Sequence, residues 1–194
     1  AIAVFTSSSW RQAAIVAAPA GRKVQRLALL TAALAYLQLV LGAGLRHLPV
    51  DASAGYFRAL VVFHLVMAAA VLVHALLLFQ DVHAAGGSGL RGRAVWVLTL
   101  VLLQISLGAG TWIVKYGWPA WFAEWGFAAG YTVQTNSLGQ ALTTTAHVAN
   151  GSLVLASALV IAIRALRVFP FLTDENAGRD ASRSPDARDS AHRA

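Results

Sequence analysis

Four long apolar segments constrain the fold of this chain more than any other feature of its sequence. No charged residue occurs in 27–45, 59–79, 94–114 or 141–163. A helix needs about 20 apolar residues to cross roughly 30 Å of hydrocarbon. Of the 194 residues, 12% are charged and 58% are hydrophobic, whereas about a quarter of a soluble domain is charged. The sequence therefore predicts an all-α integral membrane protein.

The predicted architecture is an antiparallel four-helix transmembrane bundle over residues 27–167. Residues 1–26 are interpreted as the end of a preceding helix and a basic connector, so we expect the chain to be N-terminally truncated. A short interfacial N-terminus of a complete protein is the alternative. Residues 168–194 are polar and mixed in charge, which predicts a disordered cytoplasmic tail. The four helices are expected near residues 27–45, 57–80, 94–114 and 139–166.

Lysine and arginine are unevenly divided between the two predicted sides of the membrane. Twelve lie on the side that holds both termini, and the other side has Arg46, Arg58 and Lys115. Membrane proteins carry such an excess in their cytoplasmic loops. We therefore expect a multi-pass protein of the cell inner (plasma) membrane, in contact with lipid, with both termini in the cytoplasm. The net charge of +7 reflects this bias and is not interpreted as a nucleic-acid signal.

A sequence repeat relates the first and third predicted helices. Leu37–Gly44 reads LQLVLGAG, and Leu103–Gly110 reads LQISLGAG. The apolar segment after each copy contains a histidine, His64 in the first case and His147 in the second. The chain has no cysteine, which excludes thiolate ligands and leaves histidine as the main ligand for a soft metal. The bundle is therefore predicted to be built from two helix-pair repeats.

His64 and His147 are predicted to lie at one depth, near the outer face, on the second and fourth helices. These helices run in the same direction and are diagonal partners in an up-down bundle. Two imidazoles in this arrangement can occupy both axial positions of one haem iron. Ionisable residues inside a membrane are costly and usually functional. Another metal, a proton-transfer role and a structural hydrogen bond are the alternatives.

Several neighbours of these histidines are further candidates for a cofactor site. Gly151 follows His147 by four residues and shares its helix face, which leaves room for a flat macrocycle. Gln38 and Gln104 occupy equivalent positions in the repeat and are candidates to orient the ligands; an interhelical hydrogen bond is the alternative. His74 lies on another face and is expected to form an interhelical hydrogen bond, with a second haem ligand as the alternative.

Cations and aromatic residues gather at the end of the bundle that holds the two histidines. Arg46 is the best candidate to pair with haem propionates, and Arg58 and Lys115 lie at the same end; snorkelling at the interface is the alternative reading. The loop over residues 112–127 is rich in tryptophan. It is interpreted as an interfacial anchor or as a lid over a nearby site.

The sequence resembles the haem A synthase family over about residues 1–167. The resemblance lies in the repeated Leu-Gln-x-x-Leu-Gly-Ala pattern, in Phe63–Ala68 and in Thr145–Leu153, with a further similarity to bacterial members at Gly110–Pro119. Proteins of this family have two similar four-helix halves, and this chain is similar to the C-terminal, cofactor-binding half. The resemblance implies that His64 and His147 ligate haem b.

The resemblance also implies an oxidoreductase reaction, in which a methyl group of haem O becomes the formyl group of haem A for cytochrome oxidase. Haem b would pass electrons, and haem O would bind to the missing half. Haem O synthase and cytochrome oxidase assembly proteins are the implied partners. Val61 stands three residues before His64, where the family's catalytic glutamate would be matched, so no catalytic residue is expected here. A stand-alone membrane b-type cytochrome and a haem-free scaffold are the alternatives.

Overall fold

Four long helices make up most of the computed structural model, which describes residues 6–7, 10, 21–86, 88–122 and 124–169. They are longer than the hydrocarbon thickness that a helix must cross, so their ends extend past it. No strand occurs in the described residues, and the predicted all-α membrane bundle is confirmed. The long helices are α3 (Gly21–Arg46), α4 (Ala54–Ala84), α5 (Ser88–Tyr116) and α7 (Leu138–Val168), with the short η1 (Ala120–Phe122) and α6 (Gly126–Ala129) between the last two.

Serine caps begin the two helices that carry the candidate ligands. The Ser53 hydroxyl accepts a hydrogen bond from the Tyr56 backbone N–H at 3.2 Å, and the Ser137 hydroxyl accepts one from the Gln140 N–H at 3.2 Å. Each cap satisfies one of the backbone donors that a helix start leaves free. The helices therefore start at Ala54 and Leu138, ahead of the apolar runs, and both run from the same end of the bundle.

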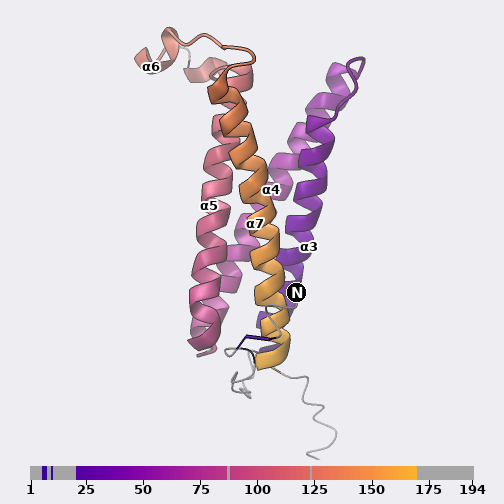
Figure 1. The fold of residues 1–194 in the computed structure, drawn as a ribbon, viewed down its shortest axis with the longest axis vertical. Coiled ribbons are helices and arrows are strands. Elements are labelled where there is room, and N and C mark those ends of the chain that lie inside the picture. Colours follow the sequence, from indigo (N-terminus) through magenta and orange to yellow (C-terminus); the bar gives the residue numbers. More distant parts are fainter. Residues whose placement is uncertain (1–5, 8–9, 11–20, 87, 123, 170–194) are drawn as a thin grey trace, which may run out of the picture.

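The helices pack in a ring in which α3 contacts α4 and α7, and α5 also contacts α4 and α7. Helices α4 and α7 are consequently diagonal partners across the bundle, as expected for up-down connectivity. We call the end with the start of α3 and the end of α7 the basic end. The opposite end, where α3 finishes and α4 begins, is called the histidine end (Figure 1).

Most of the buried core of the four long helices lies towards the basic end, and Asn150, about one turn beyond His147, extends it to the candidate ligands. Its residues span 24–35 of α3, 71–82 of α4, 90–101 of α5 and 150–165 of α7. Figure 1 shows α3 and the α5–α7 pair converging at the lower end and diverging towards the upper end. Gly21 permits this convergence, because a Cβ there would lie 2.7 Å from the Phe169 ring. The Gln25 amide also donates to the Phe169 carbonyl.

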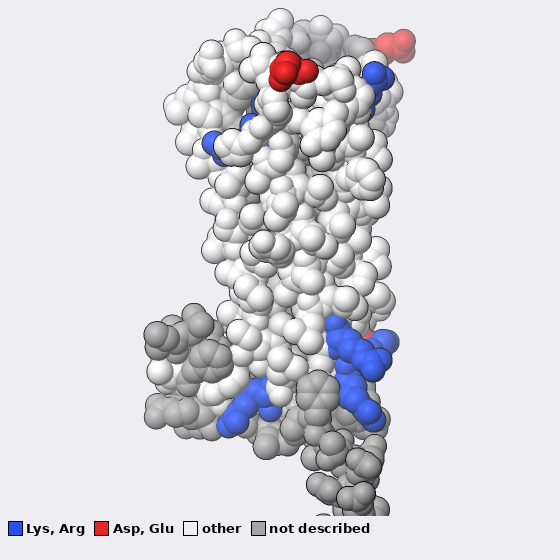
Figure 2. Space-filling model, turned by 90° about the vertical axis from the view of Figure 1, so that its right-hand side faces the viewer, with Lys and Arg blue, Asp and Glu red and all other residues white. Residues whose placement is uncertain are grey.

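Apolar side chains form the outer surface of the bundle between its two ends. Val62, Phe63, Leu65 and Val66, which surround His64 in the sequence, are 58–64% exposed. Figure 2 shows a face without charge across its middle, with lysine and arginine near both ends and more of them at the lower one. Soluble monomeric proteins rarely expose so large a contiguous apolar surface. All four long helices are long and apolar enough to span a membrane, and the chain is a multi-pass membrane protein.

The predicted terminal segments are only partly covered by the structure. Residues 21–26 of the basic connector form the first turns of α3, since lysine and arginine are good helix formers. Ser7 accepts a hydrogen bond from Arg164 at 3.2 Å, and Trp10 lies against Arg167, with 5.5 Å from the ring centre to the guanidinium carbon. The remainder of the predicted preceding helix and the tail beyond Phe169 lie outside the described residues.

Candidate functional site

Two glutamine–histidine pairs lie between the helices at the histidine end. In the first, Gln38 Nε2 of α3 is 3.3 Å from His64 Nε2 of α4. In the second, Gln104 Nε2 of α5 is 3.4 Å from His147 Nε2 of α7. The same residue types therefore meet in both helix-pair repeats at nearly the same distance. A hydrogen bond to one imidazole nitrogen fixes the ring orientation and the tautomer.

A glycine faces each imidazole ring from the helix that supplies the glutamine. A Cβ at Gly42 would lie 3.3 Å from His64 Cε1, and a Cβ at Gly108 would lie 3.1 Å from His147 Cε1. Gly42 follows Gln38 by four residues, and Gly108 follows Gln104 by four. In each helix the glycine and the glutamine therefore lie on the same face. The repeated Leu-Gln-x-x-Leu-Gly-Ala pattern thus supplies an amide beside each histidine and the space that its ring occupies.

One nitrogen of each imidazole has no hydrogen-bond partner within the described residues. Nδ1 of His64 and Nδ1 of His147 are both buried, and neither meets a donor or acceptor there. Buried polar atoms are normally satisfied, so two equivalent exceptions require an explanation. Because an amide NH2 group can only donate, Nε2 of each imidazole accepts from its glutamine and the proton of the neutral ring lies on Nδ1. A metal ligated by Nε2 would take the place of this hydrogen bond.

The second repeat contains a polar contact that the first repeat lacks. The buried Asn150 amide donates to Gln104 Oε1 at 2.8 Å and to the Leu100 carbonyl at 3.0 Å. The equivalent position in the first repeat is Met67, and Gln38 Oε1 is buried without a partner among the described residues. The amide beside His147 is consequently held more firmly. Asn150 was not identified from the sequence, although an amide in an apolar run near a candidate ligand was a usable signal.

Gly151 contacts the glutamine of its repeat. A Cβ at Gly151 would lie 3.0 Å from Gln104 Nε2. A side chain there would push the amide away from His147. Gly151 was predicted to leave room for a flat macrocycle beside His147, and the structure places it against the residue that orients this histidine instead.

A polar cavity of about 410 Å³ opens at the histidine end between the ends of α3 and α5 and the start of α7. Arg46 and Lys115 both line it, although they come from different repeats. Thr144, three residues before His147, lies on its wall. Arg58 is not among its lining residues and donates to the Ala54 carbonyl at 3.2 Å. The remaining lining residues are Asn136, Ser137, Gln140, Ala141 and Thr145.

His74 lies outside this constellation. Its Nδ1 is 2.9 Å from the Ala70 carbonyl oxygen, one turn earlier in the same helix. The contact is therefore within α4, not between helices as expected. His83 makes the same local contact with the Phe79 carbonyl at 2.7 Å. Neither histidine has a glutamine partner of the kind seen at His64 and His147.

The aromatic loop packs mainly against itself. The Phe122 ring centre is 4.9 Å from that of Trp125, and the Trp118 ring centre is 5.0 Å from that of Phe127. Trp121 remains 76% exposed. In Figure 1 this part of the chain, marked by α6, extends beyond α5 and away from α3. This placement favours the interfacial anchor over the lid.

The paired histidines are candidates for the two axial positions of a haem. They lie on diagonal helices, glycines leave space for both rings, and Nε2 of each ring could bind iron in place of its glutamine amide. No group of three or more histidine, aspartate or glutamate side chains that could hold a metal occurs in the described residues. A haem supplies the equatorial nitrogens itself and needs only two protein ligands. Comparison with protein-family models, curated proteins and solved structures gives no match.

Proposed function

We propose that the chain binds one haem b between His64 and His147 and passes electrons through it, as the cofactor half of a haem A synthase. The observation that carries the haem proposal is the matched geometry of the two repeats, in which glutamine, histidine and glycine recur together. A structural hydrogen bond would explain one such pair. It does not explain why the buried Nδ1 of both imidazoles lacks a hydrogen-bond partner among the described residues.

Different residues of the chain would have different roles in binding the cofactor. His64 and His147 would supply the axial nitrogens through Nε2, and Gln38 and Gln104, whose amides contact these atoms in the structure, would release them to the iron. A bound haem supplies a one-electron redox centre. The oxidation of a haem O methyl group to a formyl group rests on the resemblance to haem A synthases, with haem O bound by a separate half. The excess of basic residues supports a plasma-membrane orientation in which both termini are cytoplasmic and the haem lies near the outer face.

Titration of the purified chain with haemin tests the proposal. We expect binding to saturate at one haem per chain and to give the low-spin spectrum of two histidine ligands, with b-type bands on reduction. A chain that binds no haem, or only high-spin haem, contradicts it. Co-expression with a four-helix half that carries the substrate site should yield haem A, measured by chromatography of extracted haems. Haem binding without that product would favour the stand-alone b-type cytochrome.

The cavity at the histidine end predicts a role for Arg46 and Lys115 in binding the haem propionates. Because both cations are exposed to solvent, each of Arg46→Gln and Lys115→Gln should weaken haem binding about two- to fivefold. The loss should diminish at high salt, which screens exposed charges. Arg58→Gln is the matched control, since it removes the same charge at the same end without lining the cavity. Equal losses in all three variants would indicate a general surface potential and contradict the assignment.

A further inference from the structure

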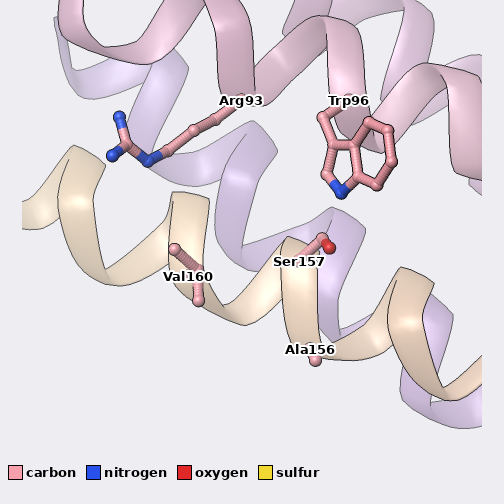
Figure 3. Close-up of a pocket in the computed structure, with 5 residues that line it drawn as sticks. All are labelled: Arg93, Trp96, Ala156, Ser157 and Val160. Atoms are coloured by element: carbon pink, nitrogen blue, oxygen red, sulfur yellow. The ribbon is translucent and has the colours of Figure 1, made fainter. Parts of the chain in front are cut away.

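A second cavity lies at the other end of the bundle, on its outer surface between α5 and α7. It has a volume of about 290 Å³ and is lined by Arg93 and Trp96 of α5 and by Ala156, Ser157 and Val160 of α7. Figure 3 shows Arg93 and Trp96 extending from one helix over the small side chains of the other. Nothing in the candidate haem site uses these residues, and the groove lies beside the buried core, away from the cavity at the histidine end.

The polar end of this groove is positively charged. The Arg93 guanidinium donates to the Gly89 carbonyl, one turn back in its own helix. A guanidinium has five N–H donors, so most of them are available to a ligand. Arg164 of α7 follows the lining residue Val160 by four positions and lies on the same helix face, so a second cation that repels Arg93 electrostatically stands on the facing helix. Among the described residues, the salt bridge at this end joins Lys23 to Asp81 at 2.9 Å, and no carboxylate lines the groove. An anion placed between α5 and α7 would relieve this repulsion.

The other end of the groove is apolar and faces the lipid. Trp96 is 56% exposed, and Ala156 and Val160 form a low wall opposite it. Arg93 is five residues into α5, about 8 Å from its start, and Trp96 lies about one further turn inside. This is the order of a phospholipid, with a charged headgroup at the interface and acyl chains below it. Tryptophan commonly lies at this level of a membrane.

We propose that this groove binds an anionic phospholipid, with the phosphate at Arg93 and the beginning of one acyl chain between Trp96 and Ala156. The Ser157 hydroxyl lines the groove between these two parts and can donate to a phosphate or glycerol oxygen. Basic pockets between membrane helices on the cytoplasmic side are known to select anionic headgroups. The charge of the groove distinguishes phosphatidylglycerol from the zwitterionic phosphatidylcholine.

The test compares phosphatidylglycerol with phosphatidylcholine as ligands of the delipidated full chain in detergent. Lipid retention is measured by native mass spectrometry, and the melting temperature by thermal unfolding. The wild-type chain should retain phosphatidylglycerol preferentially. Arg93→Gln should reduce this preference about five- to tenfold. The control is Arg91→Gln. Arg91 is two residues from Arg93, and its side chain is exposed and lies outside the groove. The Arg91→Gln chain should therefore keep nearly the wild-type preference for phosphatidylglycerol.

A second variant tests the shape of the groove without changing its charge. Ala156→Phe places a ring where the acyl chain would lie and should also reduce the preference for phosphatidylglycerol. Its melting temperature in phosphatidylcholine should match that of the wild type, which shows that the bundle is folded. Equal losses in Arg93→Gln and Arg91→Gln would overturn the proposal in favour of diffuse charge attraction. The same stabilisation by sodium phosphate alone would overturn it in favour of a site for free anions.

Discussion

Haem binding should be lost when either His64 or His147 is replaced by alanine. Each substitution would remove one of the two proposed axial ligands, and even the loss of a residue that only supports a ligand costs about 10- to 100-fold in metal affinity. We expect the affinity for haem to fall by more than about 100-fold and the low-spin spectrum to disappear. The fold should persist, because neither histidine belongs to the buried core. Haemin titration and circular dichroism measure the two effects separately.

His74→Ala is the matched control for these substitutions. It removes an imidazole from the same helix as His64, but that imidazole contacts only the Ala70 carbonyl of its own helix among the described residues. Haem affinity and spectrum should remain those of the wild type. If His147→Ala retained a low-spin spectrum while His74→Ala lost it, the assignment of His147 as an axial ligand would be contradicted.

Filling the glycine positions should reduce haem binding without removing a ligand. In Gly42→Leu and Gly108→Leu the new Cβ alone would lie 3.3 or 3.1 Å from an imidazole carbon, and the rest of the side chain would displace the ring. We expect at least a tenfold loss of haem affinity, which is about 1.4 kcal/mol. Gly108→Ala should have a smaller effect in the same direction.

Gly44→Leu provides the control for this pair, because a Cβ at Gly44 meets no atom within 4 Å. It introduces the same residue in the same repeat, and its haem affinity should be close to that of the wild type. Haemin titration of the three leucine variants in parallel gives the comparison. A loss as large at Gly44 as at Gly42 would mean that the glycines serve helix packing in general, as small residues often do in membranes, and not the histidines.

The sequence was sufficient to predict the number of helices, because each apolar run is as long as the membrane is thick. It was less informative about where the helices begin, since Ser53 and Ser137 lie outside the runs and act through backbone hydrogen bonds. The diagonal relation of α4 and α7 followed from connectivity alone. Helix ends and caps depend on local polar contacts that hydrophobic patterning does not encode.

The candidate site was only partly predictable for a related reason. The repeat identified Gln38 and Gln104 as equivalent, but only the structure shows that each contacts the histidine of its own helix pair. The repeat also contains glycines at equivalent positions, but only the rotation of α3 and α5 in the structure shows that Gly42 and Gly108 face the imidazoles. The role of Asn150 was not predicted, because the repeat has no asparagine at the equivalent position in its first copy. Helix rotation and unrepeated contacts are set by packing over the whole bundle.

The position of the buried core has a consequence for how a cofactor could be acquired. Most buried side chains of the long helices lie towards the basic end, although Ala35 and Asn150 extend into the half that holds both candidate ligands. Separating the helices near the histidines would therefore expose less buried surface than separating them at the basic end. Loading a large flat molecule from the bilayer would then require no unfolding. Substitutions near the histidines would alter occupancy with little effect on whether the chain assembles in the membrane.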